Sequence, residues 1–474
     1  MTDTQEFVEL VRGLDRGPWQ PLHGFFQSAT PLSVARAPGR LDVMGGIADY
    51  SGSLVLQLPT AEAPFAAAQR TDGDDWQIAS LPANDDESLR CVTLPRQDML
   101  ALGDYESARE WFQRDSETAW AAYLAGVVLV LGRELGADLD TGLRLLVRSD
   151  VPEAKGVSSS AALEVAALRA VGHQWGINMD GAEAARLCQL AENLVVGAPC
   201  GIMDQMTSAL GRANQLLALH CQPAEVQGFV PLPDSLGVWG IDSGIRHAVS
   251  GSDYTSVRTG AFMGYRMIAA MANFDVTVTE TSPVLQVDDP KWQGYLANLT
   301  PAEFEASYAD KLPVQIEGAV FLDRYQGTTD PVTRVQRDRV YAIRQPTAHP
   351  IDEHARVNRF RDLLALSLDE PTLIEMGELM YASHQSYSAC GLGSSGTDRL
   401  VAMVRAAGPA VGLFGAKITG GGSGGTVAVL GRKSAEGAVE EIAASYAQET
   451  GHEEYVFRGS SPGAWELDAH EVEL

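Results

Sequence analysis

Short apolar runs alternate with longer amphipathic segments along most of the chain. Runs rich in β-branched residues or leucine predict strands at residues 33–37, 54–58, 143–147, 215–219 and 426–430. In segment 184–196, apolar residues recur at helical spacing, which predicts an amphipathic helix with Leu187, Leu190, Ala191 and Leu194 on one face. An alanine-rich segment, 161–175, follows three serines and predicts a second helix. The mixture predicts an α+β fold of mixed α/β content.

The pattern of strands and helices is interrupted at two places. Residues 230–235, VPLPDS, break it between two strand-like runs and predict a domain boundary. We therefore expect one domain over residues 1–232 and a second over residues 233–474. Residues 277–346 are rich in Pro, Asp and Thr and show the least periodicity, so we expect an insertion or a long excursion there.

The length and the charge of the chain restrict its function. Its 474 residues are enough for two domains and a cleft between them. The formal net charge is -27, and so acidic a surface repels nucleic acid and anionic membranes, so we expect neither as a partner. A site for a phosphorylated ligand must therefore build local positive potential from backbone amides, a few basic side chains or a metal ion.

Cysteine usage and hydropathy favour the cytoplasm. The five cysteines are scattered and show no paired metal-ligand spacing, as expected of reduced thiols. The longest apolar run, residues 121–132, is far shorter than a bilayer span, and the N-terminus is acidic where a signal peptide would be basic. We therefore expect a cytoplasmic protein that is neither secreted nor anchored in a membrane.

Two loops rich in small residues are candidates for binding. In VPEAKGVSSSAALEV, residues 151–165, a loop opens a helix, so the amides from Gly156 to Ala161 would point at a phosphate above the helix N-terminus. The alternative is a serine N-cap on a core helix. In TGGGSGG, residues 419–425, the glycines allow close approach to a ligand or to another segment, or they only close a hairpin. Each loop alone leaves both alternatives open.

Together with APGRLDVMGGIADYSG, residues 37–52, these loops resemble the three motifs of the GHMP small-molecule kinases. The resemblance runs from about Ser33 to Leu430 and includes segments 120–127, 191–206 and 240–254, which are similar to galactokinases. Within that branch the motifs are most similar to the kinase part of L-arabinokinases. The resemblance implies a two-domain GHMP kinase fold with the active site in the interdomain cleft. It also implies a sugar and ATP as small-molecule partners, Mg2+ as a cofactor, and a monomer or homodimer.

The resemblance assigns catalysis to Asp204 and Arg40. Asp204 matches the base that faces the anomeric hydroxyl, which is a poor nucleophile until a carboxylate takes its proton. Arg40 would keep Asp204 ionised and offset charge on the transferring phosphoryl group. Without the family, these would be an acidic residue near a helix start and a surface cation.

The resemblance also assigns the nucleotide and metal contacts. The ATP-binding residues would be Lys155, Gly156, Val157, Ser158, Ser159, Ser160, Ala161, Trp120, Gly421 and Gly422. Ser160, or alternatively Ser159, and Glu192 would hold Mg2+, because hydroxyl and carboxylate oxygens suit that ion. From the sequence alone, Glu192 would lie on the solvated face of its helix and Trp120 in a core. Ala154 stands where the motif has glycine, which puts the phosphate geometry there in doubt if the backbone needs a positive φ.

Sugar recognition is assigned to Asp49 and Tyr254, with Asp49 accepting hydrogen bonds from hydroxyls in the C3 to C4 region. The alternative for Asp49 is a turn residue. Gly46 and Ile47 replace a glutamate and a histidine that galactokinases direct at the C6 hydroxymethyl group, which indicates L-arabinose as the substrate. Galactose or a uronic acid are the alternatives within the family. A catalytically silent sugar sensor is disfavoured because the serine-alanine motif is intact.

Overall fold

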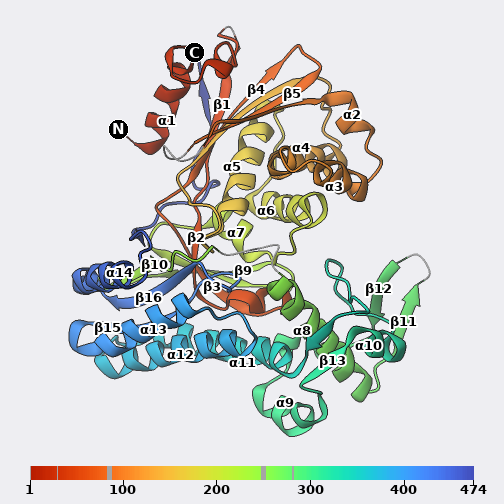
Figure 1. Cartoon of the computed structure of the whole chain (residues 1–474), viewed down its shortest axis with the longest axis vertical. Helices are drawn as coiled ribbons and strands as arrows, with labels where there is room; N and C mark the ends of the chain where they lie inside the picture. The colour runs from red at the N-terminus through yellow and green to blue at the C-terminus, as the bar shows by residue number, and fades with distance from the viewer. Residues whose placement is uncertain (1, 29, 83–87, 247–251, 280–281) are drawn as a thin grey trace.

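The computed structural model describes residues 2–28, 30–82, 88–246, 252–279 and 282–474. Figure 1 shows two halves, with the sheet around β4 and β5 in the upper half and helices α11 to α13 along the bottom. All five predicted strands are confirmed, as β1 (Leu32–Arg36), β3 (Leu54–Pro59), β7 (Gly142–Ser149), β8 (Gln215–His220) and β16 (Thr426–Arg432). No helix in these described ranges is long and apolar enough to cross a membrane.

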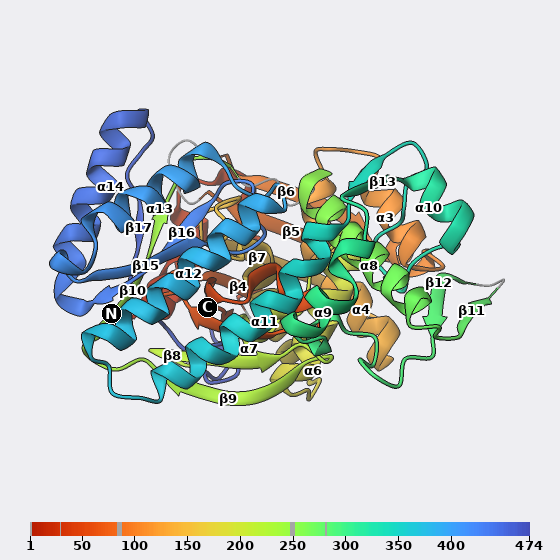
Figure 2. The same cartoon turned by 90° about the horizontal axis from the view of Figure 1, so that it is seen from below.

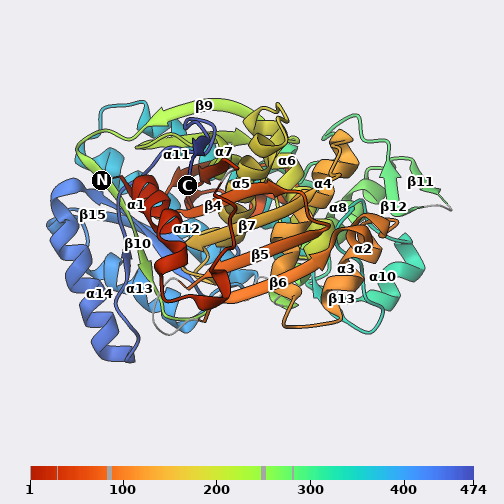
Figure 3. The same ribbon diagram turned by 90° about the horizontal axis from the view of Figure 1, so that it is seen from above.

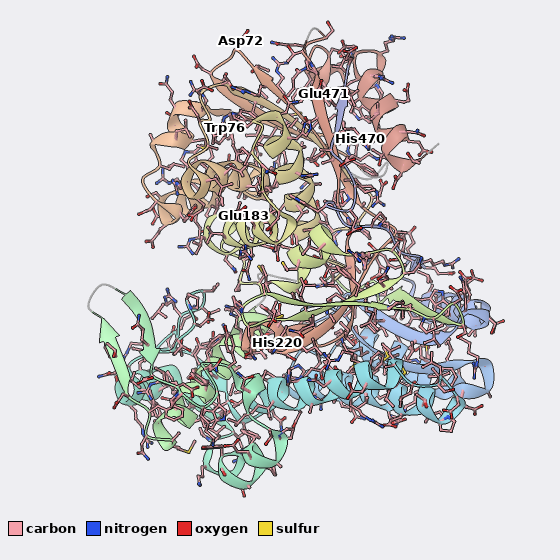
Figure 4. The ribbon with its side chains drawn as sticks, turned by 180° about the vertical axis from the view of Figure 1, so that it is seen from behind. Asp72, Trp76, Glu183, His220, His470 and Glu471 are labelled. Carbon is pink, nitrogen blue, oxygen red and sulfur yellow. The ribbon has the colours of Figure 1, made fainter. Side chains whose placement is uncertain are left out.

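The upper half is built on a six-stranded sheet in the order β18-β1-β4-β7-β5-β6. Its further strands are β4 (Pro64–Thr71), β5 (Asp75–Leu81), β6 (Arg90–Pro95) and β18 (His470–Val472). Figure 4 labels His470 and Glu471 on β18, which brings the end of the chain back beside β1. Neighbouring strands are antiparallel except β5 and β7, which run parallel.

Successive side chains of a strand point to opposite faces of this sheet, and helices pack on both faces. Both sets of side chains are therefore buried. On one face, the paired residues Val34, Ala67 and Leu146 pack with apolar residues of α1 (Asp3–Arg12). On the other, Ala66 and Val147 join a core with α4 (Ala122–Leu135) and α5 (Ser159–Gln174). Figure 3, seen from above, shows α1 lying over this sheet. The remaining helices of this half are α2 (Arg96–Ala101), α3 (Tyr105–Gln113), α6 (Gly181–Leu190) and α7 (Met203–Leu210).

Two four-stranded antiparallel sheets lie below, in the orders β2-β3-β8-β9 and β15-β16-β10-β17. Their further strands are β2 (Arg40–Met44), β9 (Glu225–Pro231), β10 (Leu236–Asp242), β15 (Leu413–Ile418) and β17 (Val456–Phe457). Figure 2 shows them from below, behind the helices α11 (Arg344–Leu364), α12 (Glu370–Ala389), α13 (Ser395–Ala407) and α14 (Glu436–Thr450).

One core joins segments from both predicted domains. Leu41 of β2 and Leu56 of β3 pack in the same apolar cluster as Phe360 of α11, Met376 of α12 and Phe414 of β15. His220, at the end of β8, lies beside His354 of α11 with ring centroids 5.9 Å apart, where Figure 4 shows the two halves meeting. Strands from the first 232 residues are therefore part of the lower half, and the boundary at residue 232 stays a prediction.

The region expected to be irregular has regular elements and a core of its own. It contains β11 (Val276–Thr279), β12 (Ser282–Val287), α9 (Pro301–Ser307), β13 (Gln315–Glu317), α10 (Gly318–Tyr325) and β14 (Val340–Ala342). With α8 (Ser252–Met271) they surround a cluster that includes Trp292, Phe304 and Phe321. The elements are short and their apolar residues are far apart in sequence, so no period was visible. Figure 1 shows this arm at one side of the lower half.

Candidate active site

A cavity of about 80 Å³ lies where the N-terminal ends of α5 and α7 face the turn after β2. Most of the residues predicted to bind or react line it together, although they come from segments far apart in the sequence. Its lining consists of Arg40, Ile47, Asp49, Ala154, Gly156, Ser158, Ser159, Ser160, Glu192, Pro199, Cys200, Gly201, Met203, Asp204, Tyr254 and Gly421.

Arg40 and Asp204 form a two-point ion pair at this cavity. Arg40 Nε donates to Asp204 Oδ1 at 2.8 Å, and Nη2 donates to Oδ2 at 2.9 Å. The third nitrogen of the guanidinium, Nη1, donates to the carbonyl of Gly156 at 2.7 Å. The Arg40 side chain is 3% exposed and that of Asp204 is 22% exposed, so only the carboxylate has appreciable access to solvent. Arg40 thus fixes the orientation of Asp204 and joins it to the serine loop.

Asp49 is buried in the wall of the same cavity, beside the start of α7 that carries Asp204. Its Oδ1 accepts from the Tyr50 amide at 2.6 Å, and a Cβ atom at Gly201 would lie 1.6 Å from its Oδ2. Glycine at position 201 therefore leaves room for the carboxylate. Burial, aided by the charge of Asp204, raises the pKa of Asp49 to about 7. Asp49 thus stabilises the turn through Tyr50 and also lines the cavity. A role in the turn therefore does not exclude contact with a sugar.

Arg258 is a functional candidate that the sequence analysis missed. It lies on α8, one helical turn after Tyr254, and it donates to both oxygens of the buried Asp330 at 2.8 and 2.9 Å. Its Nη1 also donates to the carbonyl of Cys200 at 3.0 Å, at the rim of the cavity. Its charge opposes the rise in the pKa of Asp49. The i, i+4 spacing from Tyr254 was the signal that could have indicated it.

Gly46 and Ile47 lie in different places relative to the cavity. Ile47 lines it and is 1% exposed, packed in one apolar cluster with Tyr254 and Leu392. Gly46 lies behind the wall, because a Cβ atom there would come 1.6 Å from the hydroxyl of Tyr387. Of the predicted sugar contacts, the structure therefore brings Asp49, Ile47 and Tyr254 together and leaves Gly46 outside.

Ser158 precedes α5 without capping it. Its backbone is left-handed, with φ +66°, and its buried hydroxyl has no hydrogen-bond partner. The alternative of a serine N-cap is therefore wrong, because a left-handed residue does not direct its side chain at the amides of the first turn. Val157 and Ala161 are buried, so any contact they make with a ligand comes from their backbone.

Ser160 and Glu192 are in contact, with Ser160 Oγ donating to Glu192 Oε1 at 2.8 Å. Glu192 is 2% exposed, so its expected place on a solvated helix face is wrong. The reason is a π-helical turn, Ala191–Val196, that follows α6 and changes which residues face inward. Leu194 of the predicted stripe is only half-buried as a result. Burial raises the pKa of Glu192 to about 7.

A larger cavity of about 860 Å³ lies on the other side of Ala154. Lys155 lines it and forms an ion pair with Asp242 of β10. Trp120 lines neither cavity, but its half-buried ring lies 5.2 Å from the guanidinium of Arg90, which lines the larger one. The sequence did not indicate this cavity, because its walls come from strands and loops that only the fold brings together.

The glycine-rich loop joins β15 and β16 and also faces the first cavity. Gly421 lines that cavity, whereas Gly422 packs against Leu392. A Cβ atom at Gly425 would lie 2.7 Å from the carbonyl of Lys155, so glycine there lets the two loops touch. The loop therefore closes the β15–β16 hairpin and also approaches the cavity and another segment, so the alternative that it only closes a hairpin is wrong. In the resembling segment 240–254, residues 247–251 lie outside the described residues.

Ala154 adopts a left-handed backbone with φ +59°, where an alanine is strained. We predict that Ala154→Gly relieves this strain and raises the free energy of unfolding by about 1 kcal/mol. Denaturant unfolding of the two proteins measures the difference. A variant that is less stable than the parent would contradict the prediction, because the added flexibility of the unfolded chain would then outweigh the strain.

Comparison with known proteins places these observations in a family. The model of the GHMP kinases N terminal domain matches residues 122–212, and that of the GHMP kinases C terminal domain matches residues 364–448. An L-arabinokinase from Arabidopsis thaliana is 44% identical over 93% of this chain, which spans 47% of that relative's length. A galactokinase from Chloroflexus aggregans is 30% identical over 89% of this chain and 90% of its own length.

Solved structures show the same fold. The galactokinase from Lactococcus lactis complexed with galactose matches 98% of this chain and 100% of its own, with a TM-score of 0.71 at 18% identity. A mevalonate kinase matches 90% of this chain and 99% of its own, with a TM-score of 0.52 at 14% identity. The fold is thus the mixed α/β two-domain fold of these kinases. With both family domains present in order and a galactokinase matched over nearly its whole length, the chain belongs to the GHMP kinase family.

Proposed function

We propose that this chain is an ATP-dependent sugar 1-kinase that converts L-arabinose to L-arabinose 1-phosphate and ADP. The observation that carries the proposal is one cavity lined by the Arg40–Asp204 pair together with Asp49 and Ile47. Such a cavity has a base for a hydroxyl, an acceptor for neighbouring ring hydroxyls and an apolar wall. The L-arabinokinase and galactokinase relatives support a sugar as the substrate.

Asp204 acts on the anomeric hydroxyl in this proposal. As O1 attacks the γ-phosphorus of ATP, Asp204 takes the O1 proton, the new O–P bond forms, and the bond from the γ-phosphorus to the bridging oxygen breaks. ADP leaves with that electron pair. Arg40, held on both Asp204 oxygens and on the Gly156 carbonyl, keeps the carboxylate in place and offsets charge near the transferred group.

The N-terminus of α5 would hold the phosphates of ATP, because its free amides and the helix dipole favour anions. The larger cavity beside Ala154 gives the rest of the nucleotide a place next to that helix. Trp120 would then lie behind Arg90 at the base end of the nucleotide.

Ser160 and Glu192 would hold Mg2+, and the donor set fits, since both offer hard oxygens and lie 2.8 Å apart. Among the described residues no group of three or more His, Cys, Asp or Glu side chains could hold a metal ion, so ATP phosphates would complete the coordination. Mg2+ would neutralise phosphate charge.

Ile47 explains why a pentose fits better than galactose. L-Arabinopyranose is galactose without the C6 hydroxymethyl group, so Asp49 can serve both sugars. A galactose O6 buried against Ile47 without a partner would lose roughly 1 to 3 kcal/mol. At 1.36 kcal/mol per tenfold, kcat/KM should favour L-arabinose by about 5- to 150-fold.

The proposed function is tested by ATP consumption of the purified protein with L-arabinose, D-galactose, D-glucuronate and D-galacturonate, with and without Mg2+. We expect L-arabinose to give the highest kcat/KM and Asp204→Asn to abolish most of the activity. A preference for galactose or for a uronate would make the protein a different sugar 1-kinase. No phosphorylation of any sugar would support a sugar sensor instead.

A further inference from the structure

The turn that carries Ile47 is held by side chains from distant elements. The backbone N–H groups of residues 45, 46 and 47 donate in turn to Glu353 Oε1 at 3.1 Å, Asp42 Oδ1 at 2.9 Å and Tyr387 Oη at 2.8 Å. Glu353 and Asp42 are fully buried, and so is Tyr387. The position of Ile47 is therefore determined by residues that do not line the cavity themselves.

Tyr387, on α12, connects this turn to the glycine-rich loop. Its hydroxyl accepts from the Ile47 amide and donates to the carbonyl of Gly420 at 3.0 Å. Both hydrogen-bonding roles of the hydroxyl are thus used, inside a region closed to solvent. Gly421, the next residue of that loop, lines the cavity, so one hydroxyl holds two parts of the cavity wall in register.

Tyr387 also fills the space beside Gly46. A Cβ atom at position 46 would lie 1.6 Å from the Tyr387 hydroxyl oxygen and 2.8 Å from its Cζ, far inside van der Waals contact. The backbone at Gly46 has φ +44°, which itself disfavours other residues. While Tyr387 is in place, position 46 cannot send a polar side chain toward a ligand.

The ring of Tyr387 supports the apolar wall from behind. It belongs to one buried cluster with Ile47, Tyr254, Cys390 and Ile418. Lys417 Nζ lies 5.3 Å from the centroid of this ring and forms an ion pair with Asp42. Asp42 in turn accepts a hydrogen bond from the Gly46 amide. The backbone and the side chain of Ile47 are therefore both positioned by Tyr387 and its neighbours.

We propose that Tyr387 is a specificity-determining positioning residue for the sugar. Its hydroxyl fixes Ile47 as the wall that faces the sugar, and its ring closes the space from which position 46 could offer a polar partner. The site consequently accepts pentopyranoses, which carry no exocyclic hydroxymethyl group. The proposal rests on the proposed function, because it concerns the choice of sugar at that same site.

The first test is Tyr387→Phe, which keeps the ring and removes the hydroxyl. The Ile47 amide and the Gly420 carbonyl lose their partner, so the wall can move. We expect the ratio of kcat/KM for L-arabinose to kcat/KM for D-galactose to fall at least roughly tenfold, because both buried hydrogen bonds of the hydroxyl are lost. The KM for the sugar should rise more than the KM for ATP. The matched control is Tyr381→Phe, on the same helix but packed beside Arg405, which should leave the ratio unchanged.

An equal loss of activity toward both sugars in Tyr387→Phe would show a structural role only and overturn the proposal. A wild-type protein that phosphorylates neither sugar would overturn the proposed function, and with it any role of Tyr387 in specificity. An active wild-type protein with an unchanged ratio in the variant would overturn the proposal alone. The two failures are therefore distinguishable.

The second test needs no activity and asks whether Tyr387 fills the space beside Gly46. Gly46→Ala is introduced into the wild-type protein and into Tyr387→Leu, and the unfolding equilibrium of all four proteins is measured. The backbone strain at position 46 and the close approach of its Cβ to Asp42 Oδ2, at 2.7 Å, are common to both backgrounds and cancel. The clash with the phenol exists only beside tyrosine. We expect Gly46→Ala to change the unfolding constant at least roughly tenfold more in the wild-type background. Additive effects would overturn the proposal.

Discussion

Replacing Asp204 by asparagine is expected to lower kcat for L-arabinose by about 100- to 10,000-fold, the usual contribution of a positioned general base. Asparagine keeps the shape of the side chain and one acceptor for Arg40, but it cannot take the proton from O1. Because the substitution leaves Asp49, Ile47 and Tyr254 in place, the KM for the sugar should change little. Initial rates of ADP release at saturating substrates measure the effect.

The control for this variant is Asp180→Asn, the same substitution at the N-cap of α6. Asparagine caps helices as well as aspartate does, so we expect both kcat and the thermal midpoint to stay at wild-type values. The Asp204 variant should also keep a cooperative unfolding transition. A folded Asp204→Asn protein that retains more than a tenth of the wild-type kcat would contradict the assignment of Asp204 as the base.

Removing the Asp49 side chain is expected to lower kcat/KM for the sugar by about 150- to 25,000-fold. The estimate takes two hydrogen bonds to a charged group, each contributing about 1.5 to 3 kcal/mol, at 1.36 kcal/mol per tenfold. The loss should appear mainly in the KM for the sugar, while the KM for ATP stays near its wild-type value. Steady-state kinetics of Asp49→Ala with each substrate varied in turn provide the measurement, and an unchanged sugar KM would contradict it.

The pKa of Asp49 gives this prediction a pH dependence. In the free protein, burial and the charge of Asp204 raise that pKa to about 7, with Arg258 opposing the rise. A sugar that donates two hydroxyls binds the ionised form, so its dissociation constant should rise about tenfold per unit as the pH falls below that pKa, and level off above it. Titration calorimetry measures this dissociation constant at each pH. The pKa of Glu192 is also raised to about 7, and leaving out nucleotide and Mg2+ keeps its effect on phosphate binding out of the measurement. The same slope in Asp49→Asn would show that another group is responsible.

The sequence predicted the strands and the contents of the cavity better than it predicted side-chain environments. Runs such as 54–58 and 426–430 form strands because local pattern and tertiary burial agree there. Glu192 was misplaced because a π-helical turn, invisible in the spacing of apolar residues, turns it inward. The apolar pattern did not indicate that Ser160 is its partner, whereas the motif resemblance assigned both residues to one metal ion.

Residues held by distant partners were missed for a related reason. Arg258 and Asp330 form their ion pair across the arm, and Tyr387 reaches the turn at Ile47 from another helix. The resemblance assigned Lys155 to ATP binding, and nothing in the sequence indicated that Asp242 of β10 pairs with it. Such pairings depend on which elements become neighbours, and no periodicity of 2 or 3.6 residues records that. The motif resemblance identified the residues proposed to react, and the structure shows the contacts that hold them in position.

The central claim, transfer of phosphate to the anomeric oxygen with preference for a pentose, is tested most directly by one competition experiment. The protein is given equal concentrations of L-arabinose and D-galactose with limiting ATP and Mg2+, and the products are followed by phosphorus and proton nuclear magnetic resonance. The account predicts phosphorus coupled to the anomeric proton, with L-arabinose 1-phosphate in excess by about 5- to 150-fold, the ratio of the two kcat/KM values. Equal amounts of the two products, an excess of the galactose product, or coupling to any other sugar proton would contradict it.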